Sequence, residues 1–213
     1  MKPLQKVILI LIFLSSFKSG AQVWNDFLFS NSPAMRWQYT LEGSLRYAYQ
    51  DERRTLVLRP QLRFRHDRWD FMGGLFYSYT AYPETSFQEI RPFVGAKYTY
   101  KRWINLLRLE QRFIIDGNDN PGFFRFRYYL GYRYPINNNW YLPVGAEVFW
   151  DVTSQAVNNF RTYPGVGYVK NSFRYEFYFI GEFGREALDS DIAYDRGIFR
   201  FRIHYYLPLN LDD

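Results

Sequence analysis

The feature that most constrains the fold of this chain is a two-residue alternation through residues 107–134, interrupted by a turn-like stretch rich in Asp, Asn, Gly and Pro. One set of alternate positions is apolar or aromatic, and the other is mostly arginine. Successive side chains of a β-strand point to opposite faces, so this pattern predicts a β-hairpin with one apolar and one charged face. A soluble sheet would bury the apolar face, whereas a membrane barrel turns it to lipid and turns its charges to the lumen.

Residues 1–21 have the three parts of a secretory signal peptide. A basic start is followed by an apolar run at 7–14 and by the small residues Ser19-Gly20-Ala21. The apolar run is too short to cross a bilayer as a helix, so we expect cleavage before Gln22.

Composition narrows the possible partners and chemistry. Cleavage would remove Lys2, Lys6 and Lys18 and lower the formal net charge from +6 to +3, so the high isoelectric point gives little support for nucleic acid, and none is expected. The chain has no cysteine, which excludes disulfides and thiolate metal sites. Aromatic residues make up 22% of the sequence, a load that favours strands and membrane interfaces.

The mature chain contains ten alternating segments, each close to the ~9–11 residues that a tilted membrane strand needs. They are residues 37–49, 56–65, 69–79, 90–100, 107–115, 124–134, 140–150, 160–169, 173–183 and 199–207. The connections are alternately short and long, as in barrels with short periplasmic turns and longer outer loops. The sequence therefore predicts an all-β fold, a transmembrane antiparallel up-and-down β-barrel over residues 37–213. About ten strands are expected, twelve being possible, with both termini periplasmic.

Aromatic residues agree with this arrangement, because they form the two girdles of a membrane barrel. Trp37, Trp69, Tyr98, Tyr134, Trp140 and Tyr205 fall at the predicted periplasmic ends, and Tyr47, Tyr49, Tyr77, Tyr79, Phe124 and Trp150 at the outer ends. Residues 22–36 precede the first segment and would form a periplasmic arm, a plug or an extra strand. Pro164 weakens the segment 160–169, since proline is tolerated mainly at an edge or a bulge.

The polar positions define an inward face on which basic residues outnumber acidic ones. The candidate site is a lumenal charge belt of Glu89, Arg91, Arg108, Glu110, Arg112, Arg125, Arg127, Glu147, Glu176 and His204. Registers estimated from the turn centres place Arg91 beside Glu110, Glu110 beside Arg127, Arg127 beside Glu147, and Glu176 beside His204. Because buried charges must be paired, the belt is expected to lock a narrow barrel. Any unpaired arginines would attract small anions.

The sequence offers little for catalysis, and no catalytic residue is predicted. His66 and His204 are the only histidines, and no serine is obviously placed to complete a triad with His204. Residues 116–120 lack the spacing and the terminal Glu of a calcium loop. The acidic segment 186–195 is expected to be a solvated outer loop, the best place for a partner or cation. Neither a metal nor a cofactor is expected.

Several of these runs together resemble one family. They are Trp24, Glu89-x-Arg91, Arg108-Leu-Glu-Gln-Arg112, Arg125-x-Arg127-Tyr128, Glu147-x-Phe149, and Arg161 ahead of Gly165-x-Gly167. Over nearly the whole mature length the chain resembles Gram-negative outer-membrane proteins of domain-of-unknown-function family 2490 (DUF2490). The resemblance implies a barrel and an outer-membrane address, and it supplies no activity or catalytic residues. The chain departs from general barrel practice in that its last residues, 208–213, contain no aromatic residue.

The resulting hypothesis is a non-enzymatic outer-membrane barrel with an Arg/Glu-laced lumen and a structural role or a narrow, anion-preferring passage. The expected partners are outer-membrane lipid, the barrel-assembly machinery and small anions. The alternatives are an outer-membrane hydrolase and a soluble periplasmic ligand-binding β-barrel.

Overall fold

The computed structural model describes residues 21–115, 122–152, 156–184 and 193–207, and the regular structure in them is entirely β. The strands are β1 (Gln22–Ser30), β2 (Trp37–Ala48), β3 (Arg53–His66), β4 (Trp69–Ala81), β5 (Ser86–Tyr100), β6 (Trp103–Ile115), β7 (Phe123–Pro135), β8 (Trp140–Asp151), β9 (Ala156–Thr162), β10 (Gly165–Lys170), β11 (Phe173–Gly184) and β12 (Ala193–Tyr206). The described residues include no helix long and apolar enough to cross a membrane, a finding that bears on helices alone.

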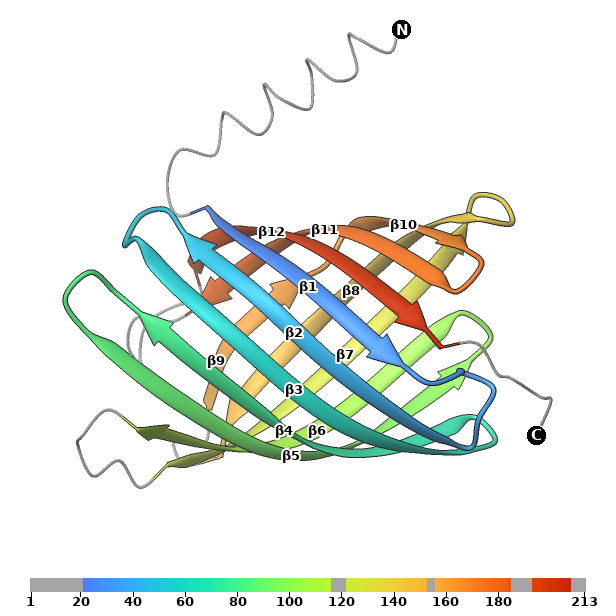
Figure 1. Ribbon diagram of the computed structural model, residues 1–213, viewed down its shortest axis with the longest axis horizontal. Coiled ribbons are helices and arrows are strands. Elements are labelled where there is room, and N and C mark those ends of the chain that lie inside the picture. The colour runs from blue at the N-terminus through green and yellow to red at the C-terminus, as the bar shows by residue number, and fades with distance from the viewer. Residues whose placement is uncertain (1–20, 116–121, 153–155, 185–192, 208–213) are drawn as a thin grey trace, which may run out of the picture.

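The strands close into a barrel, as the alternation predicts (Figure 1). Neighbouring strands run antiparallel except where β1 pairs with β12 in parallel, with Val23 opposite Phe199. The short strands β9 and β10 both pair with β8 on one side and with β11 on the other. They therefore share one place in the wall, and the twelve strands occupy eleven positions around the barrel.

All ten predicted segments are present as strands, and the eleventh position is β1, taken from the segment 22–36. This part of the segment is a strand of the wall, neither a plug nor an arm. An odd number of positions forces one parallel pair, so β1 begins at the end of the barrel opposite to the one where β12 stops. The prediction that both termini lie at the same end is therefore wrong.

The two ends of the barrel differ in their connections. At one end, called the turn end, strands are joined by residues 31–36, 67–68, 101–102, 136–139 and 171–172. Asp67, Lys101 and Asn171 begin its two-residue turns with φ of 51°, 53° and 52°. Asp and Asn adopt this left-handed backbone more readily than most residues. The opposite end, called the loop end, is where β1 begins.

The break between β9 and β10 lies at Tyr163 and Pro164, in the segment that proline was expected to weaken. Proline has no N–H to give to the ladder. The backbone N–H of Tyr163 still donates to the carbonyl of Gly145 at 2.8 Å, and the N–H of Phe179 donates to the carbonyl of Pro164 at 3.0 Å. The wall is therefore continuous through the break, and Tyr163 points inward, where it is buried.

Aromatic residues ring the outside of the turn end. Trp37, Trp69, Trp103 and Trp140 are the first residues of β2, β4, β6 and β8, and each is between 44% and 49% exposed. Each packs on an aromatic ring of a neighbouring strand, with centroid distances of 4.7 Å to Phe64, 4.9 Å to Tyr98, 4.8 Å to Tyr132 and 4.7 Å to Tyr168. Trp103 belongs to this ring although the sequence analysis did not place it there.

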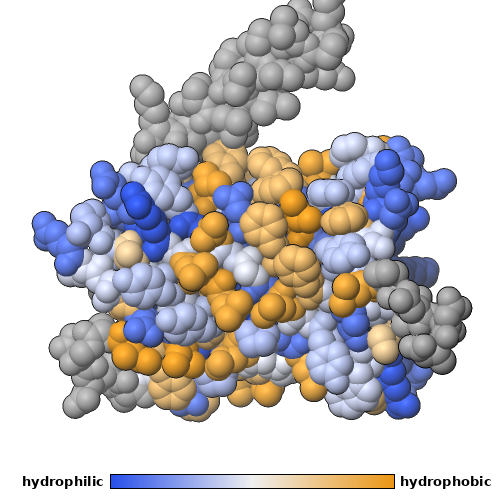
Figure 2. Space-filling view, in the orientation of Figure 1, coloured by the Kyte–Doolittle hydropathy of each residue, from blue (hydrophilic) through white to orange (hydrophobic). Residues whose placement is uncertain are grey.

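Burial in this barrel is inverted relative to a soluble protein. Asp26, Glu42, Glu110 and Glu147 are buried inside, whereas leucine, phenylalanine and tryptophan side chains are exposed on the outer face. The view in Figure 2 shows hydrophobic residues across the middle of the wall and hydrophilic residues toward its ends. The structure therefore places the polar phase of the alternation in the lumen.

Candidate functional site in the barrel lumen

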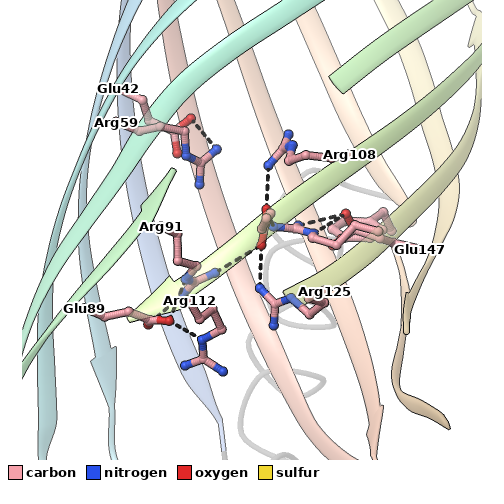
Figure 3. A network of polar contacts seen from close by, with 11 residues as sticks. Glu42, Arg59, Glu89, Arg91, Arg108, Arg112, Arg125 and Glu147 are labelled. Carbon is pink, nitrogen blue, oxygen red and sulfur yellow. Dashed lines mark hydrogen bonds and ion pairs between the residues drawn. The ribbon is translucent and has the colours of Figure 1, made fainter. Parts of the chain in front are cut away.

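A network of ion pairs centred on Glu110 lies on one side of the lumen, over strands β5 to β8 (Figure 3). The Glu110 carboxylate lies 2.7 Å from Arg125, 2.8 Å from Arg127, 3.3 Å from Arg108 and 3.7 Å from Arg91. We call Glu110 and these four arginines, together with Glu89, Arg112 and Glu147, the Glu110 network. One buried carboxylate thus contacts four guanidinium groups, and Glu89 and Glu147 supply further negative charge to the same arginines.

The other carboxylates of the Glu110 network extend it around the barrel. Arg127 also reaches Glu147 at 2.8 Å, so it bridges β6 and β8 across its own strand β7. Glu147 in addition accepts a hydrogen bond from the Tyr163 hydroxyl at 2.5 Å. Glu89 contacts Arg91 at 2.7 Å and Arg112. The expected belt therefore exists on this side of the lumen.

The contacts are diagonal, however, because the estimated strand registers are wrong by two residues. The structure places Arg125 directly opposite Glu110, and Tyr129 opposite Glu147. Long arginine side chains still span the offset, which preserves the contacts Arg91–Glu110, Arg127–Glu110 and Arg127–Glu147.

The expected pair Glu176–His204 is wrong. Arg202 is opposite Glu176, and Arg174 is opposite His204. A register shift between Glu182 and Phe183 interrupts this hairpin, and the connection 185–192 is long, so its turn centre was a poor guide.

Strand β1 supplies lumenal residues that the sequence analysis did not count. Asp26 is fully buried, bonds Arg200 and lies 3.5 Å from Arg202. Trp24 is also buried, and its ring lies under the guanidinium of Arg46 at 4.2 Å. The alternation of Trp24, Asp26 and Ser30 with outward apolar residues was the signal that could have identified them.

Aromatic rings on the inner wall hold many of the arginines. Phe76 carries Arg91 at 4.0 Å and Arg59 at 5.3 Å from its centroid. Phe149 carries Arg127 and Arg161 at 4.7 Å and Arg125 at 5.0 Å. A guanidinium is attracted to the face of an aromatic ring, so these ring contacts and the ion pairs together orient the cations.

Two cavities occupy the lumen. The larger, which we call the turn-end cavity, has a volume of about 860 Å³ and extends to Asp67, Arg68 and Thr99 at the turn end. The smaller, of about 250 Å³, lies at the loop end. Seven residues line both cavities and form the waist between them: Trp24, Arg46, Phe76, Arg91, Arg112, Arg161 and Glu182.

Glycines in the wall of the turn-end cavity let tyrosine rings lie flat against it. Tyr129 lies flat over Gly131 and Gly145, where an added Cβ would come within 2.4 Å and 2.5 Å of its hydroxyl oxygen. Tyr141 covers Gly167 in the same way. Because these rings lie along the wall, the middle of the cavity stays open.

The turn-end cavity is strongly basic. Fifteen Arg and Lys residues line it against five Asp and Glu. Near the turn end, the single carboxylate of Asp70 contacts three cations: Arg63 at 3.2 Å, Arg65 at 2.9 Å, and Lys97. Four lumenal carboxylates outside this lining, those of Asp26, Glu42, Glu89 and Glu110, pair with some of these arginines.

The two histidines lie apart from any complete catalytic arrangement. The Nε2 atom of His204 is 2.7 Å from the Ser30 hydroxyl, a serine that the sequence analysis did not find. Ser30 is only 2% exposed, and no carboxylate of the described residues lies within ion-pair distance of His204. His66 lies in a turn beside Asp67 at 3.3 Å. A nucleophile needs access to a substrate and an oriented base, which this pair lacks.

Metal ligands and the loop predictions can be placed only partly. No group of three or more His, Asp or Glu that could hold a metal occurs among residues 21–115, 122–152, 156–184 and 193–207. The stretch 116–120 and most of the acidic segment 186–195 lie outside the described residues, as does nearly all of the expected signal peptide.

Comparison with known proteins gives one match. A family model described as "Protein of unknown function (DUF2490)" matches residues 21–192, from the start of β1 through β11. No curated protein matches the chain.

Proposed function

This chain belongs to the DUF2490 family, and we propose that it is a non-enzymatic outer-membrane β-barrel whose narrow lumen admits small anions. The observation that carries the proposal is the turn-end cavity, which is open and lined by three times as many basic as acidic residues. A basic cleft with low-dielectric walls raises the local concentration of anions.

The outer face supports the membrane location. Leu45, Val94 and Leu107 are 57%, 60% and 50% exposed, far from any core, and large exposed apolar surfaces mark sites of contact with lipid or protein. The tryptophan ring at the turn end matches the aromatic girdle of membrane barrels. A soluble periplasmic barrel would leave this whole surface in water, which disfavours that alternative.

Short turns face the periplasm in outer-membrane barrels, so the proposal puts the turn end there. The turn-end cavity would then open toward the periplasm, and β1 would begin at the outer rim. Protease added to intact cells should therefore remove an epitope tag placed before Gln22. The same treatment should spare a tag placed after Asp213, and the opposite result would contradict this orientation.

A purely structural role competes with passage, because the Glu110 network fills part of the lumen with paired charges. The waist also narrows the route between the two cavities. We therefore expect a small conductance rather than that of a wide porin. Trp24→Ala would remove the bulkiest side chain of the waist and raise the conductance.

Planar-bilayer recording of the refolded mature chain tests this function. In a potassium chloride gradient, the reversal potential should shift toward the chloride equilibrium potential. Preference for potassium would contradict the proposal. If both the wild type and Trp24→Ala were silent while correctly folded, passage would be ruled out in favour of the structural role.

A further inference from the structure

The cations of the turn-end cavity fall into two classes. Some have a carboxylate partner, as Arg65 and Lys97 share Asp70. Others line the cavity with no carboxylate within ion-pair distance among the described residues, namely Arg46, Arg68, Arg133 and Arg174. The second class is the unusual one, because an uncompensated cation in a partly enclosed space is unfavourable unless an anion or water meets it.

The carboxylate that acts on the charges of both Arg133 and Arg174 is that of Glu176, and it already has other partners. Glu176 accepts the hydroxyl of Tyr141 at 2.5 Å and lies 3.9 Å from Arg202. Arg133 lies over the ring of Tyr141, with 5.8 Å from its guanidinium carbon to the centroid. Tyr141 thus stands between Glu176 and Arg133, and the carboxylate is directed away from that cation.

Among the described residues Arg174 has no close ion pair, although the charge of Glu176 acts on it from two residues along β11. Its guanidinium carbon lies 5.5 Å from the centroid of the Tyr206 ring, and His204 is directly opposite it on β12. Its Nε atom is buried and has no hydrogen-bond partner. The guanidinium is thus oriented by the Tyr206 ring and not by a short ion pair.

Lys97 adds a third cation from a separate strand, although it already shares the carboxylate of Asp70. It lies on β5, Arg133 on β7 and Arg174 on β11, and the charges of Lys97 and Arg133 are close enough to repel each other. All three line the same cavity, whose 860 Å³ exceeds the volume of a phosphate ion many times.

We propose that the turn-end cavity is a binding site for a small, multiply charged anion of the phosphate or phosphate-ester class, held by Lys97, Arg133 and Arg174. A planar guanidinium donates two parallel hydrogen bonds to phosphate oxygens, and a lysine adds a point charge. Lys97 already has Asp70, and a singly charged ion such as chloride would compensate only one of the two remaining cations, Arg133 and Arg174. The inference deepens the proposed function by naming the anion class, and binding does not require that the anion pass through the waist.

The experiment is isothermal titration calorimetry of the refolded mature chain in detergent micelles at about pH 8, where phosphate groups carry close to two negative charges. Inorganic phosphate and glycerol phosphate are the probes, and chloride at matched ionic strength is the reference. Saturable binding of phosphate above the chloride background is expected. Equal heats for phosphate and chloride would overturn the proposal.

The double variant Arg133→Gln with Arg174→Gln should weaken phosphate binding on the order of a hundredfold, because it removes two sets of charge-assisted hydrogen bonds. Arg36→Gln with Arg102→Gln is the matched control, since it removes two exposed arginines near the same end that do not line the cavity. The control should bind as the wild type does. Unchanged affinity in the Arg133 and Arg174 double variant would overturn the site.

Two further results keep the outcomes distinct. If the glutamine double variant did not fold, Arg133→Lys with Arg174→Lys would replace it, and a loss of affinity is still expected because lysine lacks the guanidinium fork. A silent bilayer with phosphate binding intact would end the passage proposal and leave the site. Conductance without phosphate binding would do the reverse.

Discussion

Six residues of the Glu110 network also line the turn-end cavity, yet the network and the cavity's arginines near the turn end have opposite charge arrangements. In the Glu110 network Glu110 contacts four arginines at short range, Glu89 contacts two and Glu147 contacts one. In the turn-end cavity Arg133 and Arg174 have no such partner among the described residues. The difference separates arginines that hold the wall together from arginines that are free to meet a ligand, and it predicts different costs for their removal.

The largest effect is expected for Glu110→Gln. Four guanidinium groups would lose their shared carboxylate, and breaking a buried ion pair from one side costs about 3–5 kcal/mol. The free energy of unfolding of the barrel, measured by urea titration in lipid vesicles, should fall by that amount. Glu84→Gln, an exposed glutamate between β4 and β5, is the control and should have an effect below about 0.5 kcal/mol. Equal stability of the two variants would show that the Glu110 network is not a structural element.

Asp26→Asn extends the test to the parallel seam between β1 and β12. Asp26 is fully buried and contacts Arg200 and Arg202, but these arginines keep Glu42 at 3.8 Å and Glu176 at 3.9 Å. The expected loss is therefore smaller, about 2–3 kcal/mol in the same titration. Asn25→Ser is the control, because it changes the adjacent, outward residue of β1 without adding a charge to the outer face. If Asp26→Asn were neutral, β1 would not be held by this contact.

The sequence was sufficient to predict most strands of the barrel wall and which of their residues face the lumen. Alternation identifies a strand and its two faces without knowing its partners, which is why the ten segments and the inward position of Glu110 were predicted. It could not show that β1 pairs in parallel with β12, because that pairing depends on closure of the whole ring. The segment from Gln22 to Ser30 alternates too, but its polar positions are mixed with Trp24 and Leu28.

The distribution of charge in the lumen could not be predicted from the sequence, for a different reason. A register error of two residues left the Glu110 contacts intact, since an arginine side chain reaches diagonally across strands. The contact between His204 and Ser30, which are 174 residues apart, was hidden because the parallel pairing of β1 with β12 was not predicted. Which arginines lack a carboxylate depends on these distances, so the turn-end cluster emerged only from the structure.

The sharpest comparison uses two arginines of one strand and one face, Arg127 and Arg133 on β7. Arg127→Gln would leave Glu147 without its 2.8 Å ion pair and remove one of the partners of Glu110, with an expected loss of about 2 kcal/mol. Arg133→Gln breaks no ion pair with a described carboxylate, so the free energy of unfolding should change by less than about 0.5 kcal/mol.

Added phosphate should distinguish Arg127 from Arg133 in a second measurement. Since a ligand that binds only the folded state stabilises it, phosphate should raise the unfolding free energy of the wild type and of Arg127→Gln, and should raise that of Arg133→Gln less. The two variants thus exchange rank between intrinsic stability and ligand response. The same rank in both measurements would mean that the lumen has one kind of arginine, and the distinction between wall and ligand site would be wrong.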